Sequence, residues 1–377
     1  MLFTLEALRA AHGDCLLLHY GEAGDPKLIL VDGGPTGIFA NALLPRLEAV
    51  RVARGGRLSI EIAMVSHIDD DHVRGILDLA RGLAGDALSE DDFRVRTLWL
   101  NAFEDTVGGE PFSPISIAAV APAGVGAAEI GAITASVRQG RDLRDLARKL
   151  GWEPNDGFDG GLVTVPDDAG VAVERGDLKL TVVGPRTAEL KELREEWETK
   201  AAELVGAEPA DVARVAAYLD RSVYNLASIV CVAELGGKRI LLTGDARGDK
   251  VLLGLESAGL MPPGGSIDLD VLKLPHHGSS RNLDVDFFER VRAPHLVISA
   301  NGRHENPDLG TLEMIATARP DAELTIHFTE TEFKDGVRPK LEETIERHRQ
   351  EGRRYRAVFP PASQELVRID LLDPLAF

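Results

Sequence analysis

The sequence predicts an α/β fold with a reactive site at one edge of a sheet. Apolar, strand-like runs alternate with segments of helical spacing along much of the 377-residue chain. Three successive runs in the carboxyl-terminal half end in polar residues, and an earlier run, 60–65, ends in the polar turn 66–72. Since α/β folds present ligand sites at the carboxyl ends of their strands, we place the chemistry at these turns.

The bulk composition is that of a folded globular protein. A hydrophobic content of 44% can fill a sizeable core, and we expect a single domain, 1–377. Cys15 and Cys231 both lie in apolar runs, so we interpret them as buried small hydrophobes rather than as a disulfide or a thiolate metal site. The formal net charge of −19 opposes broad attraction to phosphate backbones, although a local basic groove or a bound metal can still hold an anion.

Targeting signals are not recognisable in the sequence. Residues 1–7 lack the basic region and apolar core of a secretion signal, and no apolar run approaches membrane-spanning length. We therefore expect a cytoplasmic protein without a membrane partner. The sequence does not indicate protein partners.

The first hundred residues are predicted to contain a hairpin followed by alternating helices and strands. The hairpin ends at Asp32-Gly33-Gly34-Pro35, which taken alone is more typical of a turn than of a site. The predicted elements are, in order, strands 15–20 and 27–31, a helix over 38–52 that restarts at Pro45, strand 60–65, a helix to about residue 84, and strand 93–100.

Residues 104–220 are predicted to form an insertion over this core, because the pattern weakens there into glycine- and alanine-rich sequence. Within it we expect a helix over about 128–150, strand 178–183 and a charged helical segment, 187–218. Regular alternation then returns. The elements expected there are a hairpin of 228–235 and 238–242 around Gly236-Gly237, a helix to about residue 260, and strands 269–274 and 295–299.

The turn after strand 60–65 concentrates metal-binding side chains. His67, Asp69, Asp71 and His72 are closely spaced and can converge on one or two divalent cations without a large loop-ordering cost, whereas Asp70 is expected to point elsewhere. The alternative is a solvated acidic loop. Carboxylates this close repel one another unless a cation or a basic partner compensates them, so the sequence favours a metal site.

With the later motifs added, the chain resembles the metallo-β-lactamase-fold hydrolases, and among them the hydrolase domain associated with the DNA-uptake protein ComEC. The matching motifs occur in the family's order outside the insertion: Asp32-Gly33-Gly34, the turn from His67 to His72, Thr243-Gly244-Asp245 and Pro275-His276-His277-Gly278-Ser279. The resemblance implies a four-layer αβ/βα sandwich with a helical insertion. A role in DNA uptake does not carry over, because the membrane-spanning part of ComEC has no counterpart in this sequence.

The resemblance also implies a two-metal centre. It divides the ligands into His67 and Asp69 on one metal, Asp71, His72 and His277 on the other, and Asp245 as the bridge. Two features depart from the family pattern: Asp69 stands where many members have histidine, and residues 222–228 offer only amide and hydroxyl groups where a further histidine is usual. Harder ligands favour one or two ions of either zinc or manganese.

The motif set predicts a metal-dependent hydrolase. Water activated at the metals would attack phosphorus or a carbonyl carbon, and Asp71 or Asp245 would orient it. His304 follows a strand and suits substrate contact or proton transfer, while His276 is either a supporting residue beside a ligand or a functional one. The remaining histidines, His12 among them, are interpreted as structural or exposed.

A phosphodiester is the favoured substrate, because the aspartate-containing turn together with residues 276–279 resembles the nuclease-like branch of the family. Nucleic acid therefore stays open as a partner. Since fold does not fix function, two alternatives are kept. One is a small lactone, amide or ester substrate, and the other is a noncatalytic, metal-stabilised interaction module.

Overall fold

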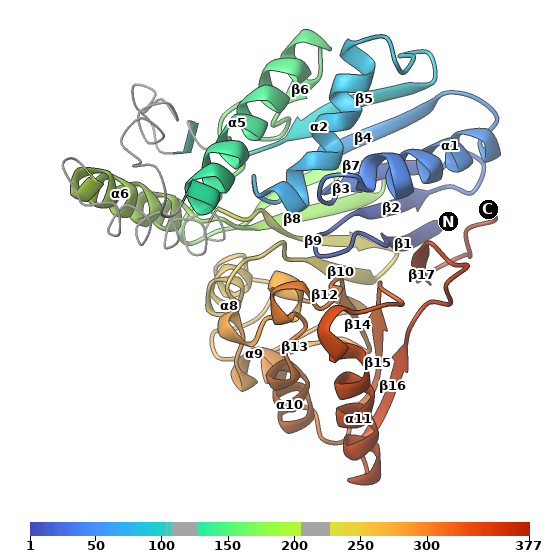
Figure 1. Cartoon of the computed structure of the whole chain (residues 1–377), viewed down its shortest axis with the longest axis vertical. Helices are drawn as coiled ribbons and strands as arrows, with labels where there is room; N and C mark the ends of the chain where they lie inside the picture. The colour runs from blue at the N-terminus through green and yellow to red at the C-terminus, as the bar shows by residue number, and fades with distance from the viewer. Residues whose placement is uncertain (103–104, 107–126, 205–226) are drawn as a thin grey trace.

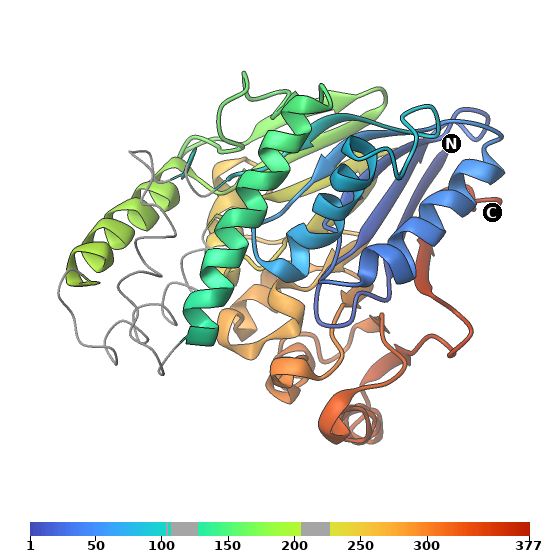
Figure 2. The ribbon, with the colours of Figure 1, turned by 45° about the horizontal axis from the view of Figure 1, so that its top comes forward.

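A computed structural model describes residues 1–102, 105–106, 127–204 and 227–377. Two sheets pack face to face, and helices cover the outer face of each (Figure 1). Figure 2 shows the same layers with α1, α2 and α5 lying over the first sheet. The expected four-layer αβ/βα sandwich is confirmed.

The first sheet is formed by the amino-terminal part of the chain and by the last strand. In the described residues its order is β17-β1-β2-β3-β4-β5-β6, antiparallel from β17 to β3 and parallel from β3 to β6. The strands are β1 (Leu2–Leu8), β2 (Leu16–Gly21), β3 (Lys27–Val31), β4 (Leu58–Met64), β5 (Phe93–Trp99), β6 (Glu153–Pro154) and β17 (Leu366–Asp370). The helices beside it are a short turn (Phe39–Leu43), α1 (Leu44–Ala53), α2 (Asp70–Ala84) and α5 (Ala127–Lys149).

The second sheet has the order β16-β15-β14-β12-β10-β9-β8-β7 in the described part of the chain, parallel from β16 to β10 and antiparallel from β10 to β7. Its strands are β7 (Val171–Arg175), β8 (Leu178–Gly184), β9 (Val230–Leu235), β10 (Lys238–Leu242), β12 (Val271–Lys273), β14 (His295–Ile298), β15 (Glu323–Phe328) and β16 (Arg354–Val358). The remaining elements are α6 (Thr187–Leu204), α8 (Gly248–Ser257), α9 (Val285–Arg290), α10 (Leu309–Ala318), α11 (Val337–Gln350) and the small pair β11 (Ile267–Asp268) and β13 (Val291–Arg292).

Three hydrophobic cores hold the four layers together. The central core lies between the sheets and includes Phe3 and Trp99 from the first sheet with Cys231 from the second. Each fully buried large apolar side chain contributes roughly 1.5–3 kcal/mol to the free energy of unfolding, because it leaves water on folding. Cys15 lies in the core between the first sheet and its helices, so both cysteines are buried, as predicted. Burial raises the pKa of the Cys231 thiol to about 12.

Most of the predicted elements are confirmed, including both hairpins and the helix that restarts at Pro45. The helix predicted over 187–218 begins at Thr187, and beyond Leu204 the prediction lies outside the described residues. Part of the segment 104–220 adds β6 to the first sheet and β7 and β8 to the second. No helix of the described residues is both long and apolar enough to cross a bilayer.

A buried carboxylate on β1 is held by basic side chains from three other segments. Glu6 accepts hydrogen bonds from Arg46 Nε at 2.8 Å, from Arg368 Nε at 3.0 Å and from His19 Nε2 at 3.1 Å. Burial raises the pKa of Glu6, but the hydrogen bonds from His19 and Arg46 outweigh this and lower it from 4.5 to about 2. The cluster joins β1 and β2 to α1 and to β17.

We expect this cluster to make the free energy of unfolding depend on pH in acid. A carboxyl group with a folded pKa of about 2 and an unfolded value of 4.5 contributes stability that is complete above pH 4.5 and is lost as the pH falls toward 2. The loss should be on the order of 3 kcal/mol, measured by urea unfolding across this range. Glu6→Gln should flatten the dependence, and an unchanged slope in that variant would assign it to other groups.

Candidate metal centre

The turn that links β4 to α2 places its histidines inside the protein and one carboxylate outside. β4 ends at Met64 and α2 begins at Asp70, and His67 and His72 are both buried. Asp70 points away from the centre, as predicted, because Gln139 Nε2 of α5 donates to its Oδ1 at 2.7 Å. The alternation of these side chains therefore separates a buried ligand group from one carboxylate that fastens α5.

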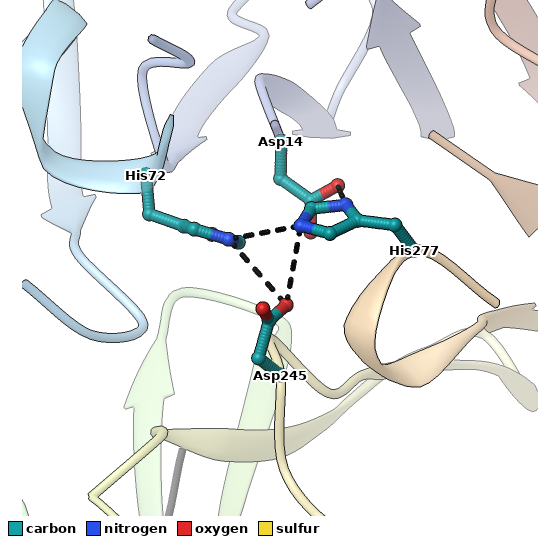
Figure 3. Close-up of side chains that lie close together, drawn as sticks. All are labelled: Asp14, His72, Asp245 and His277. Atoms are coloured by element: carbon teal, nitrogen blue, oxygen red, sulfur yellow. Dashed lines mark hydrogen bonds and ion pairs between the residues drawn. The ribbon is translucent and has the colours of Figure 1, made fainter. Parts of the chain in front are cut away.

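The structure brings all six predicted ligands together. Asp245 Oδ1 lies 3.4 Å from His72 Nε2 and 3.5 Å from His277 Nε2, and the two imidazole nitrogens are 3.3 Å apart. Figure 3 shows these side chains pointing toward one another from α2, from the loop after β10 and from the loop after β12. Asp71 Oδ2 completes this group, 3.6 Å from His277 Nε2.

The second carboxylate oxygen of Asp245 faces a different group. His67 Nε2 lies 3.8 Å from Asp245 Oδ2 and 3.4 Å from Asp69 Oδ2. His276, whose role was left open by the sequence, also lies on this side, with its Nε2 3.8 Å from Asp245 Oδ2. Asp245 thus stands between two groups of donors, which is the position of a bridging carboxylate.

The loop after β12 adopts an uncommon backbone that aims two neighbouring imidazoles at Asp245. His276 and His277 both have left-handed conformations, with φ angles of 47° and 54°. Such residues persist where the surroundings hold them, and they gather at functional sites. His276 Nδ1 is 2.7 Å from Asn282 Nδ2, and the backbone N–H of His276 donates to the carbonyl of Gly244 at 3.2 Å.

Outer partners fix which nitrogen of each histidine faces the centre. His72 Nδ1 donates to Asp32 Oδ2 at 2.9 Å, and His277 Nδ1 donates to the carbonyl of Ser299 at 2.9 Å. Both Nε2 atoms are therefore turned inward, which is the usual arrangement of histidines that bind metals. Asp32 also accepts two hydrogen bonds from Ser66 at 2.7 Å. The Asp32-Gly33-Gly34-Pro35 turn therefore supports the predicted ligand His72.

Asp14 and Lys273 are the two residues of the centre that sequence reasoning missed. Both are buried, with Asp14 Oδ2 2.6 Å from Lys273 Nζ and Asp14 Oδ1 3.5 Å from His277 Nδ1. Asp14, His72, Asp245 and His277 offer ligand atoms that all lie within 4.8 Å of one another (Figure 3). Because Asp14 faces the outer nitrogen of His277 and is paired with Lys273, we assign it to the support of His277.

The charges of the centre compensate one another strongly. Burial raises the pKa of Asp245, but His277 and His72 outweigh this and hold it well below its ordinary value. Burial lowers the pKa of His277, yet Asp245 and Asp14 outweigh this and raise it to about 10. A cation that binds these side chains must displace protons from the histidines, so its affinity falls as the pH falls.

Several buried atoms of the centre fit a divalent cation. Among the described residues, His67 Nε2, Asp69 Oδ1 and Asp245 Oδ1 have no hydrogen-bond partner. A buried acceptor left without a partner costs about 1–3 kcal/mol, and a metal ion is a partner that imidazole and carboxylate can share. A mixed nitrogen and oxygen donor set suits zinc, manganese or iron and does not choose among them.

His304 is exposed, and it lies close enough to the centre for the charges of Asp71 and His277 to act on it. No hydrogen bond or ion pair of the described residues joins it to the six ligands, and its ring lies 6.1 Å from that of His12. His12, interpreted from the sequence as structural or exposed, lies close enough to the centre for the charges of Asp71 and His277 to act on it. Of residues 222–228, only 227 and 228 are described, so the question of the absent histidine lies mostly outside the described residues.

Comparison with known proteins leaves the family open. No family model matches the chain. Microtubule-associated protein 1S of Bos taurus is 32% identical over 124 residues, which are 32% of this chain and 12% of that protein. The diiron β-hydroxylase CmlA of Streptomyces venezuelae and a point mutant of CmlA align over 97% of this chain and 54% of theirs, at 12% identity and TM-scores of 0.38 and 0.39.

The chain thus spans about half the length of these solved structures and a small part of the curated relative. TM-scores this low do not establish a common fold.

We expect Asp32→Asn to weaken metal binding by about 10- to 100-fold. The amide can keep a hydrogen bond to Ser66, but it removes the negative charge that holds His72 Nδ1–H and orients the ring. Competition with a chromogenic chelator measures the change. Asp78→Asn is the matched control, because Asp78 pairs with Arg74 on the outer side of α2. Equal affinities in wild type and Asp32→Asn would remove this role from Asp32.

Proposed function

We propose that the protein is a metal-dependent phosphodiester hydrolase. The observation that carries the proposal is the position of Asp245, whose Oδ1 faces His72 and His277 while its Oδ2 faces His67 and His276. Two donor groups that share a carboxylate suit a pair of metal ions. Such a pair would supply Lewis-acid charge to both the attacking and the leaving oxygen of a phosphodiester.

The side chains that border the solvent are the ones that can act on a substrate. Asp71 and His276 keep 23% and 27% of their side-chain surface exposed, whereas His72 and His277 are buried. Asp71 would orient the attacking water by accepting one of its hydrogen bonds, with Asp245 behind it. His304 would contact the substrate or move a proton at the mouth, and the buried histidines would hold the centre in place.

The second candidate is a noncatalytic, metal-stabilised interaction module. Microtubule-associated protein 1S is named for association with microtubules and not for a reaction. Within the short segment that matches, this name favours the interaction module. A small lactone, amide or ester remains an alternative substrate for the same centre, because all three reactions place negative charge on an oxygen beside the metal.

Metal analysis followed by a substrate panel tests the proposal. The purified protein is expected to hold one or two equivalents of a divalent metal and to hydrolyse bis(p-nitrophenyl) phosphate faster than p-nitrophenyl acetate. Asp71→Ala should lose this turnover, while Asp78→Ala, altered on the outer side of α2, should keep it. Faster turnover of the ester would favour a small ester, lactone or amide as the substrate instead of a phosphodiester. Tight metal retention without any turnover would favour the interaction module.

A further inference from the structure

A second cluster of cationic and imidazole groups lies beside the metal centre. It consists of His12, in the loop after β1, and of Arg303 and His304, in the loop after β14, and we call it the mouth cluster. Arg303 Nη1 donates to His12 Nε2 at 3.1 Å, across 291 positions of sequence. The rings of His12 and His304 meet edge to face, with centroids 6.1 Å apart.

The two loops hold the mouth cluster next to a predicted ligand. The backbone N–H of Asp14 donates to the carbonyl of Asp71 at 3.2 Å. A Cβ added to Gly13 would lie 2.0 Å from the same carbonyl oxygen, so the loop carrying His12 packs directly on Asp71. On the other side, His304 has a left-handed backbone with a φ of 59°, a conformation that gathers at functional sites.

Arg303 is the permanently charged member of the mouth cluster. Acidic residues outnumber basic ones by 61 to 42, and some arginines of the fold, such as Arg46 and Arg186, pair with carboxylates. Within the described residues, however, no ion pair joins Arg303 to a carboxylate, and Arg303 is exposed. Its only described side-chain contacts are with the imidazole of His12. The other donors of its guanidinium can therefore meet a ligand.

His12 keeps the guanidinium in place without neutralising it. Burial lowers the pKa of His12 to about 4, so the ring is neutral near pH 7 and can accept the hydrogen bond from Arg303. The backbone N–H of Lys334 donates to the carbonyl of Asn301, which places a second cationic residue beside the same loop. The mouth cluster thus brings one guanidinium and two imidazoles beside the metal centre of an acidic protein.

We propose that the mouth cluster binds a second, non-reacting phosphate group of the substrate. This inference rests on the proposed function and names its substrate class, a phosphodiester that carries a neighbouring phosphate. The planar fork of a guanidinium matches a phosphate with two parallel hydrogen bonds, and the imidazole of His304 adds a donor. Local cations of this kind are what an acidic chain needs to attract a polyanionic substrate.

Binding of two small nucleotides tests the subsite without requiring turnover. Thymidine 3′,5′-bisphosphate and thymidine 5′-monophosphate are titrated calorimetrically into the metal-loaded protein. Wild type is expected to bind the bisphosphate roughly tenfold or more tightly, the size of one charge-assisted hydrogen bond. Arg303→Ala should bring the ratio of affinities close to one, and Arg303→Lys should restore part of it. Arg354→Ala, which removes the same charge from β16, should leave the ratio at its wild-type value.

The outcomes separate the subsite from the proposed reaction. A ratio that persists in Arg303→Ala, or that falls equally in Arg354→Ala, overturns the subsite whatever the protein hydrolyses. An Arg303-dependent ratio without hydrolysis of any phosphodiester keeps the subsite and defeats the proposed function. If hydrolysis is found, kcat/KM for a 5′-phosphorylated thymidine dinucleotide relative to bis(p-nitrophenyl) phosphate should fall in Arg303→Ala, and an unchanged relative value contradicts the subsite.

Discussion

Replacing Asp245 by alanine is expected to lower metal affinity by more than roughly 100-fold and to remove hydrolysis. Both carboxylate oxygens face donor groups, Oδ1 toward His72 and His277 and Oδ2 toward His67 and His276. The variant therefore takes a donor and a negative charge from both halves of the centre at once. Metal content after dialysis and competition with a chelator measure the effect.

Asp249→Ala is the control for this substitution. Asp249 lies four positions further on, is about half exposed and pairs with Arg247, so it shares the chain segment but not the centre. Asp245→Asn should fall between alanine and wild type, because the amide oxygen still donates a lone pair without the charge. Undiminished metal content in Asp245→Ala would show that the cation binds elsewhere.

Replacing Lys273 by methionine is expected to lower the free energy of unfolding by about 3–5 kcal/mol. Lys273 and Asp14 are both 1% exposed, and their charged atoms are 2.6 Å apart. Burial raises the pKa of Asp14, but Lys273, His277 and His72 together outweigh this and lower it to about 2, so the variant takes the nearest cation from a buried carboxylate. Urea unfolding with a chelator present in every sample excludes any contribution from metal binding.

The double variant Lys273→Met with Asp14→Asn separates charge from packing. Because the amide is neutral, most of the lost stability should return if the unpaired carboxylate is the cause. Lys250→Met, which breaks an ion pair with Glu192 at the surface of α8, should cost about 1 kcal/mol or less. A double variant no more stable than Lys273→Met would assign the loss to packing of the lysine stem.

The parts of the centre that could be predicted from sequence are the ones encoded locally. His67, Asp69, Asp71 and His72 share one turn between a strand and a helix, and the strand before Asp245 belongs to a hairpin marked by two glycines. Strand ends of this kind place their side chains at one edge of a sheet, whatever the distant chain does. The resemblance to a known family then supplied the order in which the motifs meet.

Residues that act through distant contacts gave no such signal. Asp14 lies two positions before β2, and Lys273 is a single cation in an apolar run. Their pairing appears only when β2 and β12 are brought together. Arg303 and His12 likewise meet from the two ends of the chain. The buried face of α11, with Leu341, Ile345 and His348 at helical spacing, could have been predicted from its periodicity.

The pairing of β1 with β17 delays completion of the first sheet during synthesis. Thr4 lies opposite Asp370, 366 positions further along the chain, so one edge of β1 stays uncovered until β17 has been made. Contacts this distant slow folding, and an uncovered strand edge is a template for pairing with other chains. Chains that lack residues 366–370 should therefore associate through β1 and depend on chaperones more than chains that contain them.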